Sequence, residues 1–396
     1  MSLPLDGVRI LAISQFGAGP YATMMLAELG AEIIKIEDPS VGGDVSRRVP
    51  PYLAENDSLY FQSFNRNKKS LTLNLKSPEG RKVFLDLVRI SHAVFNNLRG
   101  DQGGKLGLTY DSLKDTNPRI VSCSLVGFET NGERASEPGY DYLMQAYGGY
   151  MSLTGDPDGP PAVCGVSVID HAAGFAAALG LVSALYASDK TGLGRDVEVS
   201  LFDTAYSMLT YLAIWNLNRN YKPVRRHGSA HQTLVPVQTF RTSDGHLVIF
   251  CAKEKFWEEL CRLLGADELA HDERLATFAR RFENRELVVS KLQQIFAQRP
   301  THEWVKLLRG KVPCAPVNDL SLALREPFVA SREMIVETEH PVFGTVRQVA
   351  GPFKMGGDRC KHRRAPQLGE HTGEILKGYL GYNEQQISEL RQKHVI

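Results

Sequence analysis

The length and charge of the chain limit what kind of protein it can be. At 396 residues it exceeds the size at which a single hydrophobic core usually stops growing, so we expect two domains. Its 46 lysine and arginine residues balance 45 aspartate and glutamate residues and leave a formal net charge of +1, which gives no field to attract nucleic acid or an anionic membrane.

The first half of the chain alternates strand and helix patterns. An apolar run over residues 8–13 precedes a small-residue turn at 17–20, and Pro20 suits the first position of a helix that ends at Gly30. A second strand is predicted over 32–36, and strand, helix and strand within about thirty residues form a βαβ unit of a parallel sheet. The alternation continues with strands predicted at 93–96, 120–125 and 196–200 and helices predicted at 78–91, 172–188 and 201–217.

The pattern changes after a polar and basic connector at residues 219–231. Two strand-like runs, 237–242 and 246–251, flank a Ser-Asp-Gly turn sequence and predict an antiparallel hairpin. Further helices are predicted at 255–264, 284–298 and 301–308, so the part of the chain that follows the connector indicates a smaller α+β domain. Near the end of the chain, Asn383 and Gln386 have the spacing of a helix-capping box.

The cysteine and histidine patterns argue against disulfides and metal sites. None of the six cysteines forms a CxxC pair, and several lie in apolar runs, so buried free thiols are expected. The eleven histidines include no HExxH spacing, so we expect no metal. The N-terminus lacks the pattern of a signal peptide, and no apolar run approaches the roughly 20 residues that span a bilayer. We therefore expect a cytoplasmic protein with no membrane or nucleic-acid partner.

One motif suggests a nucleotide cofactor. Residues 17–22 fit the G-x-G-x-x-[GA] fingerprint between a strand and a helix, and Glu37 follows at the place of a ribose-binding acid. However, Pro20 lacks the amide that would face a pyrophosphate, and no hydride-transfer residues follow. An NAD-dependent dehydrogenase therefore stays an alternative, while a tight turn without a phosphate is the preferred interpretation.

A series of short motifs runs along almost the whole chain. They are PLDGVRIL (4–11), AGP (18–20), LGAEIIKIE (29–37), NRNKKS (65–70), LNLK (73–76), EG (79–80), PGYD (138–141), KTGLGRDV (190–197), VPCAPV (312–317), REMIV (332–336), LGEHT (368–372) and LGY (380–382). Together they resemble the class III CoA-transferases, the family of formyl-CoA transferase and carnitine CoA-transferase. They occur in the order typical of that family, which makes the resemblance far more specific than any single motif.

Asp170 is the residue to which the resemblance assigns the chemistry. By position alone it reads as the N-cap of the predicted helix, where the helix dipole would keep its carboxylate ionised. The matching aspartate of the family is a covalent nucleophile, which implies transfer of CoA between carboxylic acids through an aspartyl anhydride and an aspartyl-CoA thioester. Tyr140 and Asp141 match residues that modulate the site.

The resemblance also implies how coenzyme A, here a substrate and not a tightly bound cofactor, contacts the chain. A loop before the first helix covers the thioester, basic side chains contact the phosphates, and a later stretch encloses the adenine and pantetheine parts. The matching residues are Phe16, Gly17, Ala18, Arg47, Lys76, Asn97, Leu98, Lys105 and Leu106.

The chain also departs from formyl-CoA transferase. Asp38 replaces a CoA-binding arginine, Gly17 replaces a glutamine, and the glycine-rich loop that excludes water is missing, which argues against formyl and oxalyl substrates. A 2-methylacyl-CoA racemase of the same fold is the second alternative, but it carries Gly-His-Asp where this chain has Gly-Tyr-Asp at 139–141, and tyrosine is a poor general base. The donor and acceptor acids stay open; Arg225, Arg226 and His227 are candidates for binding a second carboxylate.

The strand and helix patterns and the family resemblance predict the same fold. We expect an α/β protein with a Rossmann-like parallel sheet in a large CoA-binding domain over residues 1–221 and a small α+β domain over 222–325. Residues 326–396 then return to the large domain. The resemblance further implies an interlocked homodimer, in which each chain threads through the other.

Overall fold

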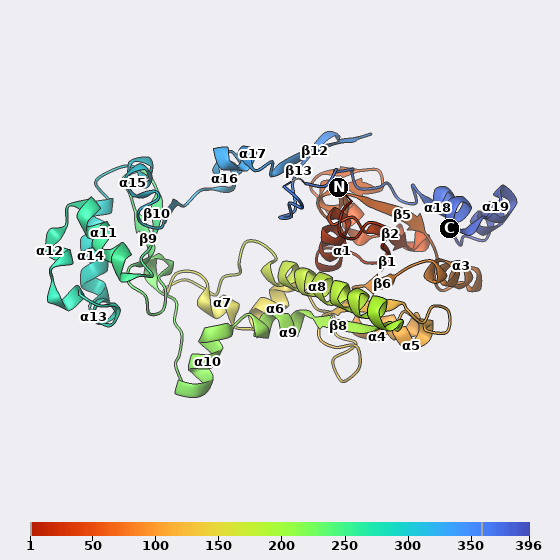
Figure 1. The fold of residues 1–396 in the computed structure, drawn as a ribbon, viewed down its shortest axis with the longest axis horizontal. Coiled ribbons are helices and arrows are strands. Elements are labelled where there is room, and N and C mark those ends of the chain that lie inside the picture. Colours follow the sequence, from red (N-terminus) through yellow and green to blue (C-terminus); the bar gives the residue numbers. More distant parts are fainter. Residues whose placement is uncertain (1, 358) are drawn as a thin grey trace. The chain divides into compact units, whose positions relative to one another are not determined.

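The computed structural model describes residues 2–357 and 359–396, and its main feature is a six-stranded sheet (Figure 1). The strands lie in the order β5-β2-β1-β6-β7-β8, and every neighbouring pair is parallel. Counted along the chain this is the order 3-2-1-4-5-6 of the Rossmann fold, so the predicted parallel sheet is confirmed. Its strands are β1 (Arg9–Ile13), β2 (Glu32–Glu37), β5 (Lys68–Thr72), β6 (Ala93–Asn96), β7 (Val121–Val126) and β8 (Arg195–Ser200).

Two groups of helices bury the sheet. Alternate strand residues such as Leu11 and Ile34 pack with Phe84 of α3, Ile375 of α18 and Ile387 of α19 in one hydrophobic core. α8 packs on β7, on β8 and on α1. These helices are α1 (Ala18–Glu28), α3 (Pro78–Arg89), α8 (Val168–Thr191), α18 (Thr372–Leu380) and α19 (Glu384–Gln392).

The chain forms two compact units. The first contains residues 1–148, 165–209 and 329–396, and the second contains 149–164 and 210–328. The C-terminal segment thus groups with the sheet, while 149–164 and 210–221 group differently from the predicted boundary at 221. The further elements of the first unit are β3 (Leu53–Ala54), β4 (Asp57–Ser58), α2 (Leu59–Asn65), α4 (Gly100–Lys105), α5 (Tyr110–Leu113), α6 (Asp141–Tyr147), α9 (Leu201–Ser207), β12 (Ile335–His340) and β13 (Gly344–Val349).

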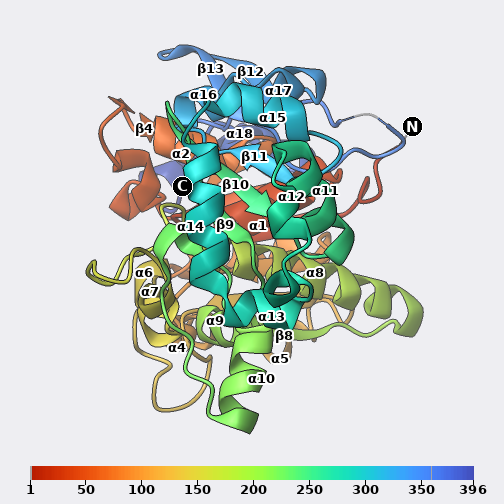
Figure 2. The ribbon, with the colours of Figure 1, turned by 90° about the vertical axis from the view of Figure 1, so that its left-hand side faces the viewer.

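The second unit is built around a three-stranded antiparallel sheet with helices packed against it (Figure 2). The predicted hairpin is confirmed as β9 (Val237–Arg241) and β10 (His246–Phe250), and β11 (Cys314–Pro316) pairs with β10. Its helices are α7 (Tyr150–Leu153), α10 (Thr210–Arg219), α11 (Glu254–Leu264), α12 (Asp267–Ala270), α13 (Phe278–Glu283), α14 (Arg285–Phe296), α15 (Thr301–Leu308) and α16 (Leu320–Leu324), while α17 (Pro327–Ser331) spans the boundary between the units.

Two helices that position the site begin earlier than the sequence pattern predicts. α1 begins at Ala18, so Pro20 is its third residue. α8 begins at Val168 after Ser167, which places Asp170 in the first turn and not at the N-cap. The predicted capping box at Asn383 is confirmed.

α8 has a composition that needs a structural explanation. Among the described residues it is the one helix long and apolar enough to cross a membrane by length and composition. Its contacts with β7, β8 and α1 explain much of this apolar character, because a core helix passes the same test.

Candidate active site

The parallel sheet places the N-terminal loop and the segment after β6 next to each other. β1 and β6 are neighbours, and the chain leaves them toward opposite edges of the sheet. In such sheets ligands bind outside the carboxyl ends of the strands at this switch point. The Asn97 side chain joins the two segments here: it accepts a hydrogen bond from the Gln15 amide at 2.8 Å and donates one to the Gln15 carbonyl at 2.9 Å.

A cavity of about 160 Å³ opens at this switch point. It brings together residues from the N-terminal loop, from the segment after β6, from the loop before α6 and from the first turn of α8. Seven residues that the sequence analysis assigned to the site line it: Phe16, Gly17, Ala18, Asn97, Leu98, Tyr140 and Asp170.

Asp170 has an unusual environment for a carboxylate. Within the described residues its side-chain oxygens accept no hydrogen bond, and no cation forms an ion pair with it. Burial, together with the negative charge of Asp141, raises the pKa of Asp170 to about 7. This corrects the expectation that the helix dipole keeps this carboxylate ionised.

The contacts of Asp141 explain why the dipole of α8 does not stabilise the ionised form of Asp170. The Asp141 carboxylate is buried and accepts hydrogen bonds from the backbone amides of Ile169 at 2.7 Å and Asp170 at 3.2 Å, and from Gln145 Nε2 at 2.7 Å. Ser167 makes no side-chain cap bond. Asp141 therefore caps α8 from outside the helix, and it occupies the amides that would otherwise stabilise a charge on Asp170.

Gly17 leaves space beside the Asp170 carboxylate. A Cβ atom at this position would lie 3.1 Å from Asp170 Oδ2 and 4.0 Å from the Tyr60 hydroxyl. Such a contact is tight, so a side chain here would crowd the carboxylate. Glycine thus keeps free the volume that a reacting group needs.

A buried ion pair fixes the loop in front of Gly17. Lys35 Nζ lies 2.8 Å from Asp44 Oδ2, and Asp44 Oδ1 accepts a hydrogen bond from the Phe16 amide at 3.2 Å. Phe16 has a φ of 62°, a left-handed conformation that is uncommon for a bulky residue. Its ring meets that of Tyr140 edge to face, with centroids 6.3 Å apart. Strained backbone held by surrounding contacts is typical of functional sites.

A second cavity of about 250 Å³ adjoins the first and shares Gln15 and Leu98 with it. Leu106 and Lys76, both assigned from the sequence, line this cavity together with Asp38. Lys76 is exposed, and no carboxylate of the described residues forms an ion pair with it. Its ammonium group is therefore available for an anionic ligand.

Two residues that were predicted to contact CoA have partners within the chain. Arg47 is 1% exposed, and its guanidinium lies 2.8 Å from both Glu37 carboxylate oxygens, over the ring of Phe61. The Arg47 guanidinium is therefore engaged within the chain, and its contact with a phosphate stays a prediction. Lys105 lines neither cavity and pairs with Asp101 one helical turn away.

The structure also removes the support for a dinucleotide site. Besides the pair with Arg47, Glu37 accepts hydrogen bonds from Ser70 Oγ at 2.6 Å and from the Asp44 amide at 3.1 Å. The charge of Arg47 holds the pKa of Glu37 below its usual value in spite of burial. A carboxylate engaged in this way is not free to bind a ribose. Residues 18–22 of the glycine pattern form the start of α1 and not the tight turn expected from the sequence.

Larger cavities lie elsewhere in the first unit and do not contain the predicted chemistry. One of about 550 Å³ is lined by Phe64, His171 and the β13 strand, and one of about 860 Å³ is lined by residues before β1 and around Cys360. Neither contains Asp170. The volume of a cavity alone therefore does not identify the candidate active site in this protein.

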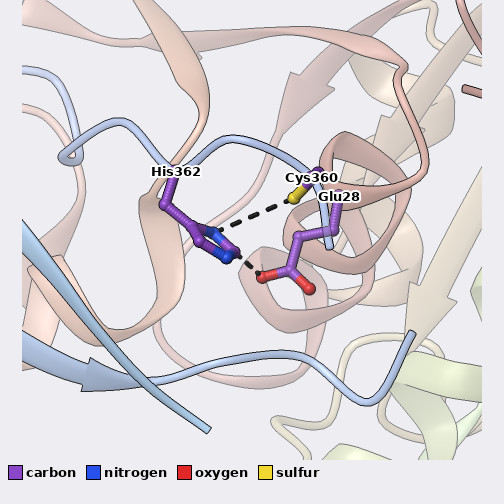
Figure 3. Close-up of side chains that lie close together, drawn as sticks. All are labelled: Glu28, Cys360 and His362. Atoms are coloured by element: carbon purple, nitrogen blue, oxygen red, sulfur yellow. Dashed lines mark hydrogen bonds and ion pairs between the residues drawn. The ribbon is translucent and has the colours of Figure 1, made fainter. Parts of the chain in front are cut away.

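Glu28, Cys360 and His362 form the one group of potential metal ligands found in the described residues (Figure 3). His362 Nδ1 lies 3.8 Å from Cys360 Sγ and 3.9 Å from Glu28 Oε1. Glu28 Oε1 already accepts hydrogen bonds from the buried Arg66. Burial and the charge of Glu28 raise the pKa of the Cys360 thiol, which disfavours the thiolate that binds metals. Glu28 is therefore the partner of Arg66 in a buried ion pair, and we assign no metal to the group.

The three connector residues assigned to a second carboxylate have different surroundings within the second unit. Arg225 donates a hydrogen bond to the Pro160 carbonyl at 2.7 Å, and His227 Nδ1 lies 2.8 Å from Asp156. Arg226 forms no ion pair with any described residue.

Sequence reasoning missed one residue of the candidate site in the first unit, Tyr60. Burial and the negative charge of Asp170 raise the pKa of the Tyr60 hydroxyl. No sequence motif marks this residue.

Comparison with known proteins places this geometry in a family context. The model of CoA-transferase family III matches residues 5–372. Succinyl-CoA:glutarate CoA-transferase from Homo sapiens is 34% identical over 99% of this chain and 90% of its own length. Succinyl-CoA:mesaconate CoA-transferase from Haloarcula marismortui is 34% identical over 94% of this chain and 95% of its own, and acetyl-CoA:oxalate CoA-transferase from Acetobacter aceti is 34% identical over 95% and 96%.

Solved structures agree with this match. A CAIB/BAIF family protein from Brucella suis superposes with a TM-score of 0.82 at 32% identity, covering 96% of this chain and 100% of the other. Rv3272 from Mycobacterium tuberculosis superposes with a TM-score of 0.83 at 28% identity, covering 94% and 99%.

Proposed function

The chain belongs to CoA-transferase family III and is a CoA-transferase that uses acyl-CoA as a substrate, and from this premise we propose that Asp170 is its covalent nucleophile. The observation that carries the proposal is the unpaired Asp170 carboxylate in the switch-point cavity. Burial without a hydrogen-bond donor raises its pKa to about 7, and a carboxylate that is poorly solvated and more basic is a stronger nucleophile.

In the first half of the reaction CoA moves onto the enzyme. An Asp170 oxygen attacks the acyl-CoA carbonyl, the carbon–sulfur bond breaks, and a mixed anhydride and CoA thiolate form. The thiolate then attacks the aspartyl carbonyl and releases the donor acid as a carboxylate, which leaves an aspartyl-CoA thioester. The free volume beside Gly17 gives the reacting carbonyl room next to Oδ2.

In the second half the acceptor acid reverses these steps. Its carboxylate attacks the aspartyl-CoA carbonyl and expels the thiolate, and the thiolate attacks the acceptor's carbonyl in the new anhydride. Asp170 leaves as a free carboxylate. One carboxyl group is held as a thioester or an anhydride at every stage, so no ATP is needed. Both intermediates hydrolyse in water, so the edge-to-face pair of Phe16 and Tyr140 is well placed to limit solvent at the cavity.

We further propose dicarboxylic acids as substrates. The relatives from Homo sapiens and Haloarcula marismortui are named for succinyl-CoA with glutarate and with mesaconate. Purified enzyme mixed with succinyl-CoA and a panel of acids is expected to give glutaryl-CoA or mesaconyl-CoA, detected by mass spectrometry, and little ester from hexanoate. If no acid accepts CoA while the enzyme exchanges the α-hydrogen of a 2-methylacyl-CoA, the racemase alternative replaces this proposal.

CoA is proposed to lie across the two adjoining cavities, with its thioester at Asp170 and its adenosine end near Lys76. Lys76→Glu is expected to raise the KM for acyl-CoA about tenfold, equivalent to about 1.4 kcal/mol, because it replaces an attraction to phosphate by a repulsion. The KM for the acceptor acid should change little. Lys82→Glu, an exposed lysine outside both cavities, is the matched control, and equal effects on both KM values would contradict the placement.

An interlocked homodimer and a cytoplasmic location complete the proposal. The surface of α8 supports the proposal of a partner subunit. Its side chains Leu179 and Tyr186 are 71% and 66% exposed, which is a large apolar area for an isolated chain. Two chains that thread through each other are expected to stay together on dilution. A monomeric mass in light scattering at micromolar concentration would argue against this assembly.

A further inference from the structure

Gln232 links the surroundings of two arginines in the second unit. Its Oε1 accepts a hydrogen bond at 3.3 Å from the amide of Val224, two residues before Arg226, and its carbonyl accepts one at 3.2 Å from Arg285 Nη2. Arg226 belongs to the connector and Arg285 begins α14, 59 positions later in the sequence. Burial and then the charge of Arg226 lower the pKa of Arg285 to about 10. Neither guanidinium forms an ion pair with a carboxylate of the described residues. Two like charges held together in this way destabilise the chain unless something neutralises them.

Both guanidinium groups also have unused buried donors. Arg226 Nε and Arg285 Nη1 are buried nitrogen atoms with no hydrogen-bond partner. Arg285 uses another nitrogen, Nη2, to bond the carbonyls of His231 at 2.9 Å and Gln232 at 3.2 Å. Buried donors without partners are rare in folded proteins because each costs about 1–3 kcal/mol.

Neighbouring groups of the chain do not fill this gap. The nearby Asp156 pairs with His227, and Arg225 bonds the Pro160 carbonyl. The Tyr221 hydroxyl, which also interacts with Arg285, donates to Gln232 Oε1 at 3.0 Å. Among the described residues, this region thus supplies two cations and two free donors, while the nearby Asp156 carboxylate pairs with His227.

We propose that Arg226 and Arg285 form a binding site for the carboxylate of a small organic acid. Planar guanidinium groups bind carboxylates through paired hydrogen bonds, and such a ligand would neutralise both charges and satisfy both free donors. The choice of an organic acid rests on the proposed function, in which carboxylic acids are substrates. The site retains Arg226 of the three connector residues expected from the sequence and adds Arg285, which no motif indicated.

Arg226→Gln is the informative variant because Arg226 donates no hydrogen bond to any described residue. Its loss removes the repulsion with Arg285, so thermal stability without added acid is expected to stay the same or to rise. A purely structural arginine would instead lower it. Lys222→Gln, an exposed lysine four residues earlier, is the control for the loss of one positive charge.

Isothermal titration of the CoA-free dimer with glutarate, in a low-salt buffer without phosphate, tests the site. Arg226→Gln is expected to weaken glutarate binding at least about tenfold, about 1.4 kcal/mol, while Lys222→Gln binds like the wild type. CoA titrations should be the same in all three proteins. Wild-type affinity in Arg226→Gln, or no acid binding by the wild type, overturns the proposal. Weaker binding of CoA alone would assign the arginines to its phosphates instead.

This test is independent of the catalytic proposal. The titration contains no acyl-CoA, so it measures acid binding at the arginine pair even if Asp170 forms no covalent intermediate. Conversely, the acid panel with succinyl-CoA reports CoA transfer whether or not these arginines bind the acid. Failure of one proposal is therefore distinguishable from failure of the other.

Discussion

Replacing Asp170 by asparagine is expected to reduce CoA transfer by several orders of magnitude in an enzyme that still folds and binds CoA. No other carboxylate lines the switch-point cavity among the described residues, so none can form the anhydride or hold CoA as a thioester between donor and acceptor. Transfer rates from succinyl-CoA, measured beside CoA affinity, check the result. A folded Asp170→Asn enzyme that transfers CoA at the wild-type rate would refute the catalytic role.

The same substitution is expected to stabilise the protein. The pKa of Asp170 rises from 3.8 in the unfolded chain to about 7 in the fold, a difference on the order of 4 kcal/mol at pH 7 and above. Because the folded pKa is the higher one, wild-type stability falls as the pH rises from about 4 to about 7. The neutral asparagine avoids this loss, so its advantage is largest above pH 7 and vanishes below about pH 4.

Asp203→Asn is the matched control for this stability measurement. Asp203 also lies in the first turn of a helix, α9, three residues after its N-cap Ser200, but its side chain is exposed. Removing its charge should cost a few tenths to about 1 kcal/mol, because an exposed acid near a helix N-terminus is stabilising. Opposite signs for the two substitutions in denaturant unfolding would locate the effect in the burial of Asp170.

Replacing Asp141 by alanine is expected to destabilise the protein by roughly 2–5 kcal/mol. It removes the acceptor of the backbone amides of Ile169 and Asp170, and each donor left without an acceptor costs about 1–3 kcal/mol. Asp141→Asn keeps an acceptor oxygen and should recover most of this loss. Denaturant unfolding of both variants measures the difference.

Asp141→Asn should also change the pH dependence of catalysis. Transfer requires ionised Asp170, so the wild-type rate is expected to rise with pH and to level off above about pH 7. The Asp141 charge contributes to that high pKa, so the asparagine variant should reach its plateau at a lower pH. An unchanged profile would mean that Asp141 acts through helix capping alone.

The residues of the candidate site could be predicted from the sequence mainly through the family resemblance, because position alone marks Asp170 only as a helix cap. The strand patterns add the parallel sheet, and the segments after parallel strands meet at one edge of such a sheet. This is why residues as far apart as Phe16, Asn97 and Asp170 line one cavity.

The electrostatics of the site could not be predicted in the same way. The acid that caps α8 is Asp141, 29 positions before Asp170, so no local signal marks the helix start or the raised pKa. The sequence predicts a phosphate contact for Arg47. Its pairing with Glu37 and its hydrogen bond to the Pro366 carbonyl are tertiary contacts that no local pattern marks. Arg226 and Arg285 likewise meet only through the fold of the second unit.

Trapping the activated aspartyl carboxyl group of the enzyme tests the central claim most directly. Wild-type enzyme is incubated with succinyl-CoA and then treated with hydroxylamine, or with borohydride, and its peptides are analysed by mass spectrometry. The account predicts a modified peptide in which Asp170 carries the hydroxamate or is reduced to the alcohol, and no such change in Asp170→Asn or without acyl-CoA. Modification at another carboxylate, or an unmodified Asp170 in an enzyme that is actively transferring CoA, would contradict it.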